Sequence, residues 1–129
     1  MKILVCGGRN YKDKEALYAF LDDLDGNGKK GGITAVVHGA APGADTLAGE
    51  WAADRNRTVY SHPAQWDMYG SLAGSIRNTH MLLMHPDIEM VIAFPGDRDT
   101  QDMINKAKEK GIMVHQVEEG YGKRTQSNE

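Results

Sequence analysis

A short apolar run followed directly by a glycine-rich turn occurs three times in the chain, and this repeat restricts the fold more than any other feature. The apolar runs are residues 2–6, 33–38 and 90–94, and the turns after them begin at Gly7, Gly39 and Pro95. Each turn leads into a segment whose apolar residues recur three and four positions apart, as on one face of a helix. This repeat is the βαβ pattern of an open parallel sheet.

Two further short runs, residues 58–60 and 112–117, raise the expected number of strands to about five. We find no internal domain boundary, so residues 1–118 are expected to form a single domain. Residues 119–129 are expected to form a polar C-terminal tail. The polar stretch at residues 25–32 is expected to be a flexible connection.

The expected helices follow from capping residues and apolar spacing. Asp13 is expected to cap the first helix, and Asp99 or Thr100 the fourth. The third helix is expected to begin near Ser71, and its buried side is expected to consist of Leu72, Ile76 and Leu83.

Composition excludes several classes of protein. The net charge is −3 and the chain has no long basic run, which argues against binding to duplex nucleic acid. It has one cysteine and therefore no internal disulfide, as is usual in a reducing cytoplasm. Neither a signal peptide nor an apolar run of membrane-spanning length is present, so a cytoplasmic protein without membrane contact is expected.

The carboxyl ends of parallel strands are where ligands bind in open α/β sheets, so the glycine turns are expected to line one pocket there. Small residues let a ligand approach the backbone closely. The free N–H groups at the start of a following helix attract anions, phosphate above all. Fifteen glycines among 129 residues, against a usual content of roughly 7%, agree with a need for such turns.

Five sequence blocks in order resemble the SLOG superfamily, and within it the branch related to YspA and YpsA, also called DUF2493. They span nearly the whole chain, and they are residues 6–9, 38–45, 66–70, 76–78 and 94–96. The resemblance implies a Rossmann-like three-layer sandwich, with an open, mostly parallel sheet and helices on both faces. It also implies binding of nucleotides or nucleotide-derived molecules.

The "Lonely Guy" phosphoribohydrolases are distant relatives in this superfamily, and their catalytic motif is altered here. Their glycine-rich motif ends in a catalytic glutamate, and Met103 occupies that position. Two of the motif's glycines are replaced by Asp97 and Asp99. A thioether can neither activate water nor stabilise an oxocarbenium-like transition state. Only Asp45 and Asp102 are candidates to replace the glutamate, so whether the protein is an enzyme stays open.

The residues expected to bind the ligand come from the three turns and from the third helix. They are Gly7, Gly8, Arg9, Gly39, Ala41, Gly43, Ala44, Asp45, Arg77, Asn78, Pro95, Gly96 and Thr100. Arg9 and Arg77 would contact phosphate. Asp45 is equally suited to cap a helix and to accept a hydrogen bond from a ribose hydroxyl.

Other chemistry-bearing residues have simpler interpretations. Trp66 and Tyr69 are candidates for base stacking, although large aromatic side chains in a loop more often anchor that loop to the core. Cys6 ends a buried strand and is interpreted as an apolar filler. No cluster of cysteine and histidine residues has metal-ligand spacing, so no metal site is expected.

The leading hypothesis is therefore a domain that senses or sequesters a nucleotide-derived small molecule and requires no further cofactor. The alternatives are a nucleoside 5′-monophosphate phosphoribohydrolase or related N-glycosidase, and a module that regulates protein partners without turnover. Association into a homodimer or a larger homo-oligomer is also left open.

Overall fold

The computed structural model describes residues 1–26 and 31–119. It contains a five-stranded sheet in which every pair of neighbouring strands is parallel. The strand order is β3-β2-β1-β4-β5. The strands are β1 (Lys2–Cys6), β2 (Ala35–His38), β3 (Thr58–Ser61), β4 (Met90–Ala93) and β5 (Met113–Gln116).

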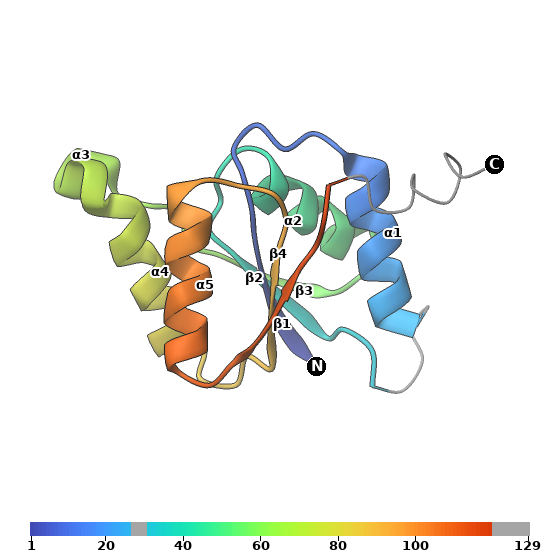
Figure 1. Ribbon diagram of the computed structural model, residues 1–129. Helices are drawn as coiled ribbons and strands as arrows, with labels where there is room; N and C mark the ends of the chain where they lie inside the picture. The colour runs from blue at the N-terminus through green and yellow to red at the C-terminus, as the bar shows by residue number, and fades with distance from the viewer. Residues whose placement is uncertain (27–30, 120–129) are drawn as a thin grey trace.

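Helices cover both faces of this sheet, which makes three layers (Figure 1). Helices α1 (Lys14–Asp25) and α2 (Ala44–Asp54) pack on one face, and α4 (Ala73–Met84) and α5 (Arg98–Glu109) pack on the other. The short helix α3 (Trp66–Tyr69) and the 3₁₀ turn η2 (Gly70–Leu72) precede α4. The α/β architecture and the Rossmann-like layering expected from the sequence are thus confirmed.

Strand β1 shows why a central parallel strand is apolar throughout. Ile3 and Val5 belong to the core beneath α1 and α2, whereas Leu4 and Cys6 belong to the core beneath α4 and α5. Successive side chains of a strand point to opposite faces, so a strand covered on both faces needs apolar residues at every position. The structure also confirms Asp13 as the cap of α1, because its carboxylate accepts a hydrogen bond from the N–H of Ala16 at 3.2 Å.

The side of the third expected helix, α4, that was predicted to be buried is wrong. Leu72 and Leu83 are 64% and 61% exposed, and Ile76 is only half-buried. The buried face of α4 consists instead of Ala73, Gly74, Arg77, Asn78, Met81 and Leu82. Apolar spacing identified the wrong face because the buried one carries polar side chains that have partners inside the molecule.

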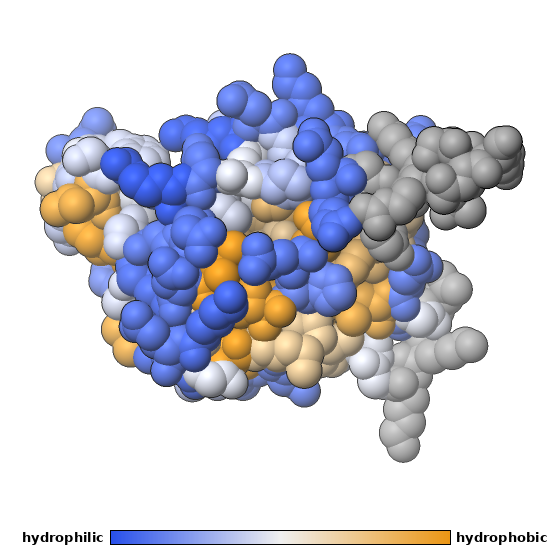
Figure 2. All heavy atoms as spheres, viewed as in Figure 1, coloured by the Kyte–Doolittle hydropathy of each residue, from blue (hydrophilic) through white to orange (hydrophobic). Residues whose placement is uncertain are grey.

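A stretch of surface near α3 and α4 is apolar as a result (Figure 2). Met68 and Met84 are exposed there together with Leu72 and Leu83.

The start of α5 also differs from expectation, since Asp97 is its N-cap residue rather than Asp99 or Thr100.

Two sequence-based expectations fall largely outside the described residues, namely the polar connection around residues 27–30 and the tail beyond residue 119. The division into a domain of residues 1–118 and a tail stays a prediction. Among the residues that the structure describes, no helix has the length and apolar character needed to cross a membrane.

Candidate functional site

The three glycine turns meet at the carboxyl edge of the sheet and pack backbone against backbone. A Cβ atom on Gly43 would collide with the carbonyl oxygen of Gly8, and one on Gly8 would lie 2.9 Å from the carbonyl oxygen of Pro95. A Cβ on Gly7 would lie 2.6 Å from the Cβ of Ala44. The absence of side chains at these positions therefore lets the turns approach one another.

These contacts also occupy backbone groups that were expected to face a ligand. The N–H of Gly8 donates to the carbonyl of Pro95 at 2.8 Å, and the N–H of Ala44 donates to the carbonyl of Gly8 at 3.2 Å. Gly8, Gly43, Ala44, Pro95 and Gly96 are not among the residues that line the cavity described next. They form the framework that shapes it.

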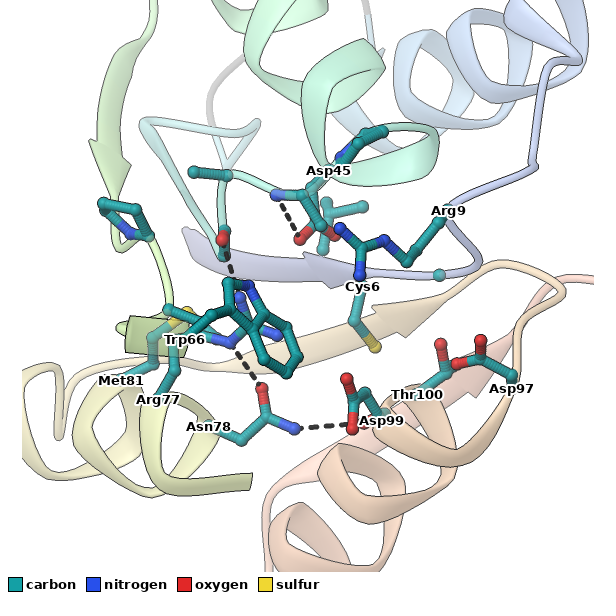
Figure 3. A pocket seen from close by; sticks show the side chains of 18 residues that line it. Cys6, Arg9, Asp45, Trp66, Arg77, Asn78, Met81, Asp97, Asp99 and Thr100 are labelled. Carbon is teal, nitrogen blue, oxygen red and sulfur yellow. Dashed lines mark hydrogen bonds between the residues drawn. The ribbon is translucent and has the colours of Figure 1, made fainter. Parts of the chain in front are cut away.

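A cavity of about 210 Å³ opens at the junction of these turns (Figure 3). Its wall comes from the end of β1 and the turn after it, the turn after β2 with the start of α2, the loop after β3 with the start of α3, α4 and the start of α5. Of the residues expected to bind a ligand, those that line it are Gly7, Arg9, Gly39, Ala41, Asp45, Arg77, Asn78 and Thr100. The structure thus gathers these side chains from four separate segments around one space.

Arg77 reaches from α4 toward the turn after β2, and only 9% of it is exposed. Its Nη1 donates to the carbonyl of Gly39 at 2.6 Å, and its Nε donates to the Oδ1 of Asn78 at 3.0 Å. Its charge is not neutralised by a salt bridge to any residue that the structure describes. The carboxylate of Asp45 interacts with this charge without forming a salt bridge. A buried cation that no salt bridge neutralises is costly, so this wall of the cavity attracts anions.

Asp45 lies in the first turn of α2 and is 4% exposed. It does not cap the helix, because Gly43 is the N-cap residue. Its Oδ2 accepts a hydrogen bond from the N–H of Ala41 at 3.3 Å, whereas its Oδ1 has no hydrogen-bond partner within the described chain. Burial raises the pKa of this carboxyl to about 6 against the opposing effect of Arg77. The free oxygen is suited to accept a hydrogen bond from a bound molecule.

Comparison with known proteins identifies the family. The model of the YspA, cpYpsA-related SLOG family matches residues 1–69. The Gene 61 protein of Mycobacterium phage D29 is 33% identical over 120 residues, which cover 88% of this chain and 93% of that protein. This chain belongs to the YspA, cpYpsA-related SLOG family. No solved structure gives a significant match.

Membership of the SLOG family indicates nucleotide-related ligand binding or a related activity. The matched range includes Asp45 and the turns after β1 and β2, whereas Arg77 and the turn after β4 lie beyond it. The acidic side chains of Asp97 and Asp99 also line the cavity of this SLOG domain. Its wall therefore combines two arginines with three carboxylates, and it can offer both anion contacts and acceptors for hydroxyl groups.

Of the three positions linked to the catalytic glutamate, Met103 and Asp102 lie outside the cavity of this SLOG domain and Asp45 lines it. Met103 is fully buried in the core beneath α4 and α5. Asp102 accepts hydrogen bonds from Lys106 at 2.8 Å and from Asn78 and Ser75 at 3.1 Å each. These bonds hold its pKa below the usual value despite the opposing effect of burial, which is the largest single influence. Of the two carboxylate candidates, only Asp45 faces the cavity.

The two aromatic candidates lie in different places. Trp66 lines the cavity, and the guanidinium carbon of Arg9 lies 5.6 Å from the centre of its ring, at cation–π distance. Tyr69 does not line this cavity but a second one, described below. Trp66 is 40% exposed, so it is not an anchor buried in the core.

Several cavity residues of the SLOG domain were not among those that the sequence predicted to bind a ligand. They are Val5, Cys6, Ala40, Pro42, Pro63, Ala64 and Met81, together with Asp97 and Asp99. Pro63 and Ala64 follow β3, so counting every strand end at the carboxyl edge would have found them. Burial and the nearby Asp45 raise the pKa of the Cys6 thiol, which makes it an unreactive part of the wall.

Proposed function

We propose that the cavity binds a nucleotide-derived small molecule, so that the protein senses or sequesters this molecule. The observation that carries the proposal is that one cavity is lined by both a buried cation and a buried hydrogen-bond acceptor. Arg77 is a buried cation without a salt bridge to a described residue, and Asp45 is a buried carboxylate with one oxygen free. A nucleotide has both complements, because its phosphate can contact the arginine and its ribose hydroxyls can donate to the carboxylate.

Neighbouring residues support the same orientation of the ligand. Arg9 is exposed and lines the cavity, so its side chain can move from its contact with Trp66 toward a phosphate. The first turn of α5 adds N–H groups that have no acceptor within the helix. The face of the Trp66 ring is available to stack on a base.

The test is a panel of nucleotides with each of the common bases, measured by thermal shift and titration calorimetry. A ligand at one hundred times its dissociation constant stabilises the folded state by about 2.7 kcal/mol. We expect Arg9→Ala to weaken the binding of the best ligand about tenfold, which corresponds to about 1.4 kcal/mol.

Arg98→Ala is the matched control, because Arg98 is also exposed and near the cavity but does not line it. We expect it to change the affinity less than about twofold. Equal weakening by both variants would mean that the contribution of Arg9 is general electrostatic attraction. The proposal is wrong if no member of the panel stabilises the protein.

Asp45 also favours a second candidate function, an N-glycosidase that acts on nucleoside 5′-monophosphates. A carboxyl with a pKa near 6 in a cavity can act as a general acid or base. The release of free base from monophosphates, and its loss in Asp45→Asn, would establish this activity. If release persisted in the variant, Asp45 would not be the catalytic group.

A further inference from the structure

A second cavity, of about 290 Å³, lies beside the first and shares Pro63 and Arg77 with it. Its other lining residues come from the end of β3 and the loop after it, from α3 and from α4. They are Ser61, His62, Gln65, Tyr69, Ala73, Ile76, His80 and Met84. Arg77, whose guanidinium we assign to the anionic part of the ligand, thus lines both spaces.

The two cavities differ in chemistry. Asp45, Asp97 and Asp99 line the first, whereas no carboxylate of residues 1–26 and 31–119 lines the second. In the second, Ser61, Gln65 and Tyr69 offer hydrogen-bond donors and acceptors without charge. The pKa of His62 is lowered, first by burial and then by Arg77 and His80, so its ring is neutral at pH 7. The second cavity therefore suits a neutral group that can form hydrogen bonds.

The volumes of the cavities indicate that one ligand occupies both. Small-molecule sites are typically about 300–1,000 Å³, and neither cavity alone reaches that range, although together they fall within it. The side chains of Tyr69, Ile76 and Met84 add apolar surface on which a ring can lie.

We propose that the second cavity is a subsite for a neutral, hydroxyl-bearing group joined through phosphate to the nucleoside in the first cavity. The ligand class is then a nucleoside phosphate ester with two arms, not a simple mononucleotide. Arg77 contacts the phosphate where the arms meet. This inference rests on the proposed function, because it places the nucleoside arm in the first cavity.

The test compares ADP, GDP, CDP and UDP with ADP-glucose, GDP-glucose, CDP-glucose and UDP-glucose by calorimetry on the full chain. Each sugar ester carries a glucosyl group on the terminal phosphate and one negative charge fewer than its diphosphate, so charge attraction alone would favour the diphosphate. For the preferred base we expect the sugar ester to bind at least tenfold more tightly than the diphosphate. We expect Ser61→Trp and His80→Ala to remove most of this difference and to change diphosphate affinity less than twofold, because both residues are exposed and line only the second cavity.

Leu83→Ala is the control, since Leu83 is exposed on α4 but lines neither cavity. The inference is overturned, and the proposed function is not, if diphosphates bind and the sugar adds no affinity. It is also overturned if the added affinity survives both subsite variants. If none of the nucleotides binds, the proposed function fails and this inference fails with it.

Discussion

At the scale of single residues, the main feature is a buried carboxylate with one oxygen that has no hydrogen-bond partner among the described residues. Asp45 follows Ala44, which is fully buried, and the N–H of Ala41 satisfies only one of its oxygens. A buried polar atom without a partner destabilises a folded protein by about 1–3 kcal/mol. Such a residue is therefore a candidate for a role in binding.

Asp45→Asn tests this cost directly. The folded-state pKa of about 6 lies above the ordinary aspartate value of 3.8, so the folded protein binds the proton more tightly than the unfolded chain. The charge then lowers stability as the pH rises from about 4 through 6. We expect the variant to be more stable than the wild type by about 1–3 kcal/mol at pH 8, and by less than about 1 kcal/mol near pH 4. Urea unfolding at the two pH values measures this, and a gain that does not depend on pH would contradict it.

Met103→Glu would restore the residue type of the hydrolase motif without restoring its function. Met103 is fully buried in the core between the sheet and α5, away from the cavity. A carboxylate there must lose its hydration or take up a proton, at a cost on the order of 3 kcal/mol or more. We expect a large fall in the midpoint of urea unfolding and no release of free base from nucleoside monophosphates. A stable variant that cleaves them would show that residue 103 can reach the ligand.

At the scale of elements, the positions of the strands and turns could be predicted from the sequence, whereas the packing of one helix could not. The strands, their common edge and the gathering of Arg9 and Asp45 follow from apolar runs and from the geometry of parallel sheets. The place of Arg77 at the cavity was expected from the family resemblance, because Arg77 lies inside a helix and not at a strand end. The buried face of α4 could not be predicted, because it carries the polar side chains of Arg77 and Asn78. These side chains form hydrogen bonds with each other and with residues distant in sequence, which apolar spacing does not reveal.

Gly43→Ala should report the packing between two of these turns. Gly43 has a φ of +85°, and an added methyl group would collide with the backbone of Gly8 and Arg9. Gly31→Ala is the control, because Gly31 has a φ of +91° but open space around it. We expect the Gly43 variant to lose at least about 1 kcal/mol more stability than the Gly31 variant. Equal losses in chemical denaturation would mean that only backbone strain matters.

The loop after β3 is linked to the end of α4 by a pair of histidines. The Nε2 atoms of His62 and His85 lie 2.8 Å apart, so one ring donates and the other accepts. Burial is the main cause that lowers the pKa of both rings. The unfolded chain then takes up protons more readily below about pH 6.5, so the pair favours unfolding as the pH falls. We expect His62→Gln/His85→Gln to reduce this loss of stability between pH 7 and 5, and unchanged pH dependence in urea unfolding would contradict it.

At the scale of the whole molecule, the cavity depends on both halves of the chain. Residues 1–69 contain β1, β2 and β3 with α1 and α2, but the second face of the sheet is covered by α4 and α5. Without those helices, Leu4, Cys6 and Val37 would be exposed to water. We expect a fragment of residues 1–69 to show no cooperative thermal transition by circular dichroism, while the full chain shows one. A cooperative transition in the fragment would mean that the first core suffices.

The central position of β1 has a consequence for how the protein is made. β1 is synthesised before the other four strands of the sheet, yet one of its two neighbours, β4, spans residues 90–93. Until that segment has been synthesised, one edge of the oldest strand has no hydrogen-bonding partner and is open to pairing with other chains. Nascent and truncated chains should therefore aggregate before they can bind any ligand, and rapid completion of translation should protect the protein from this fate.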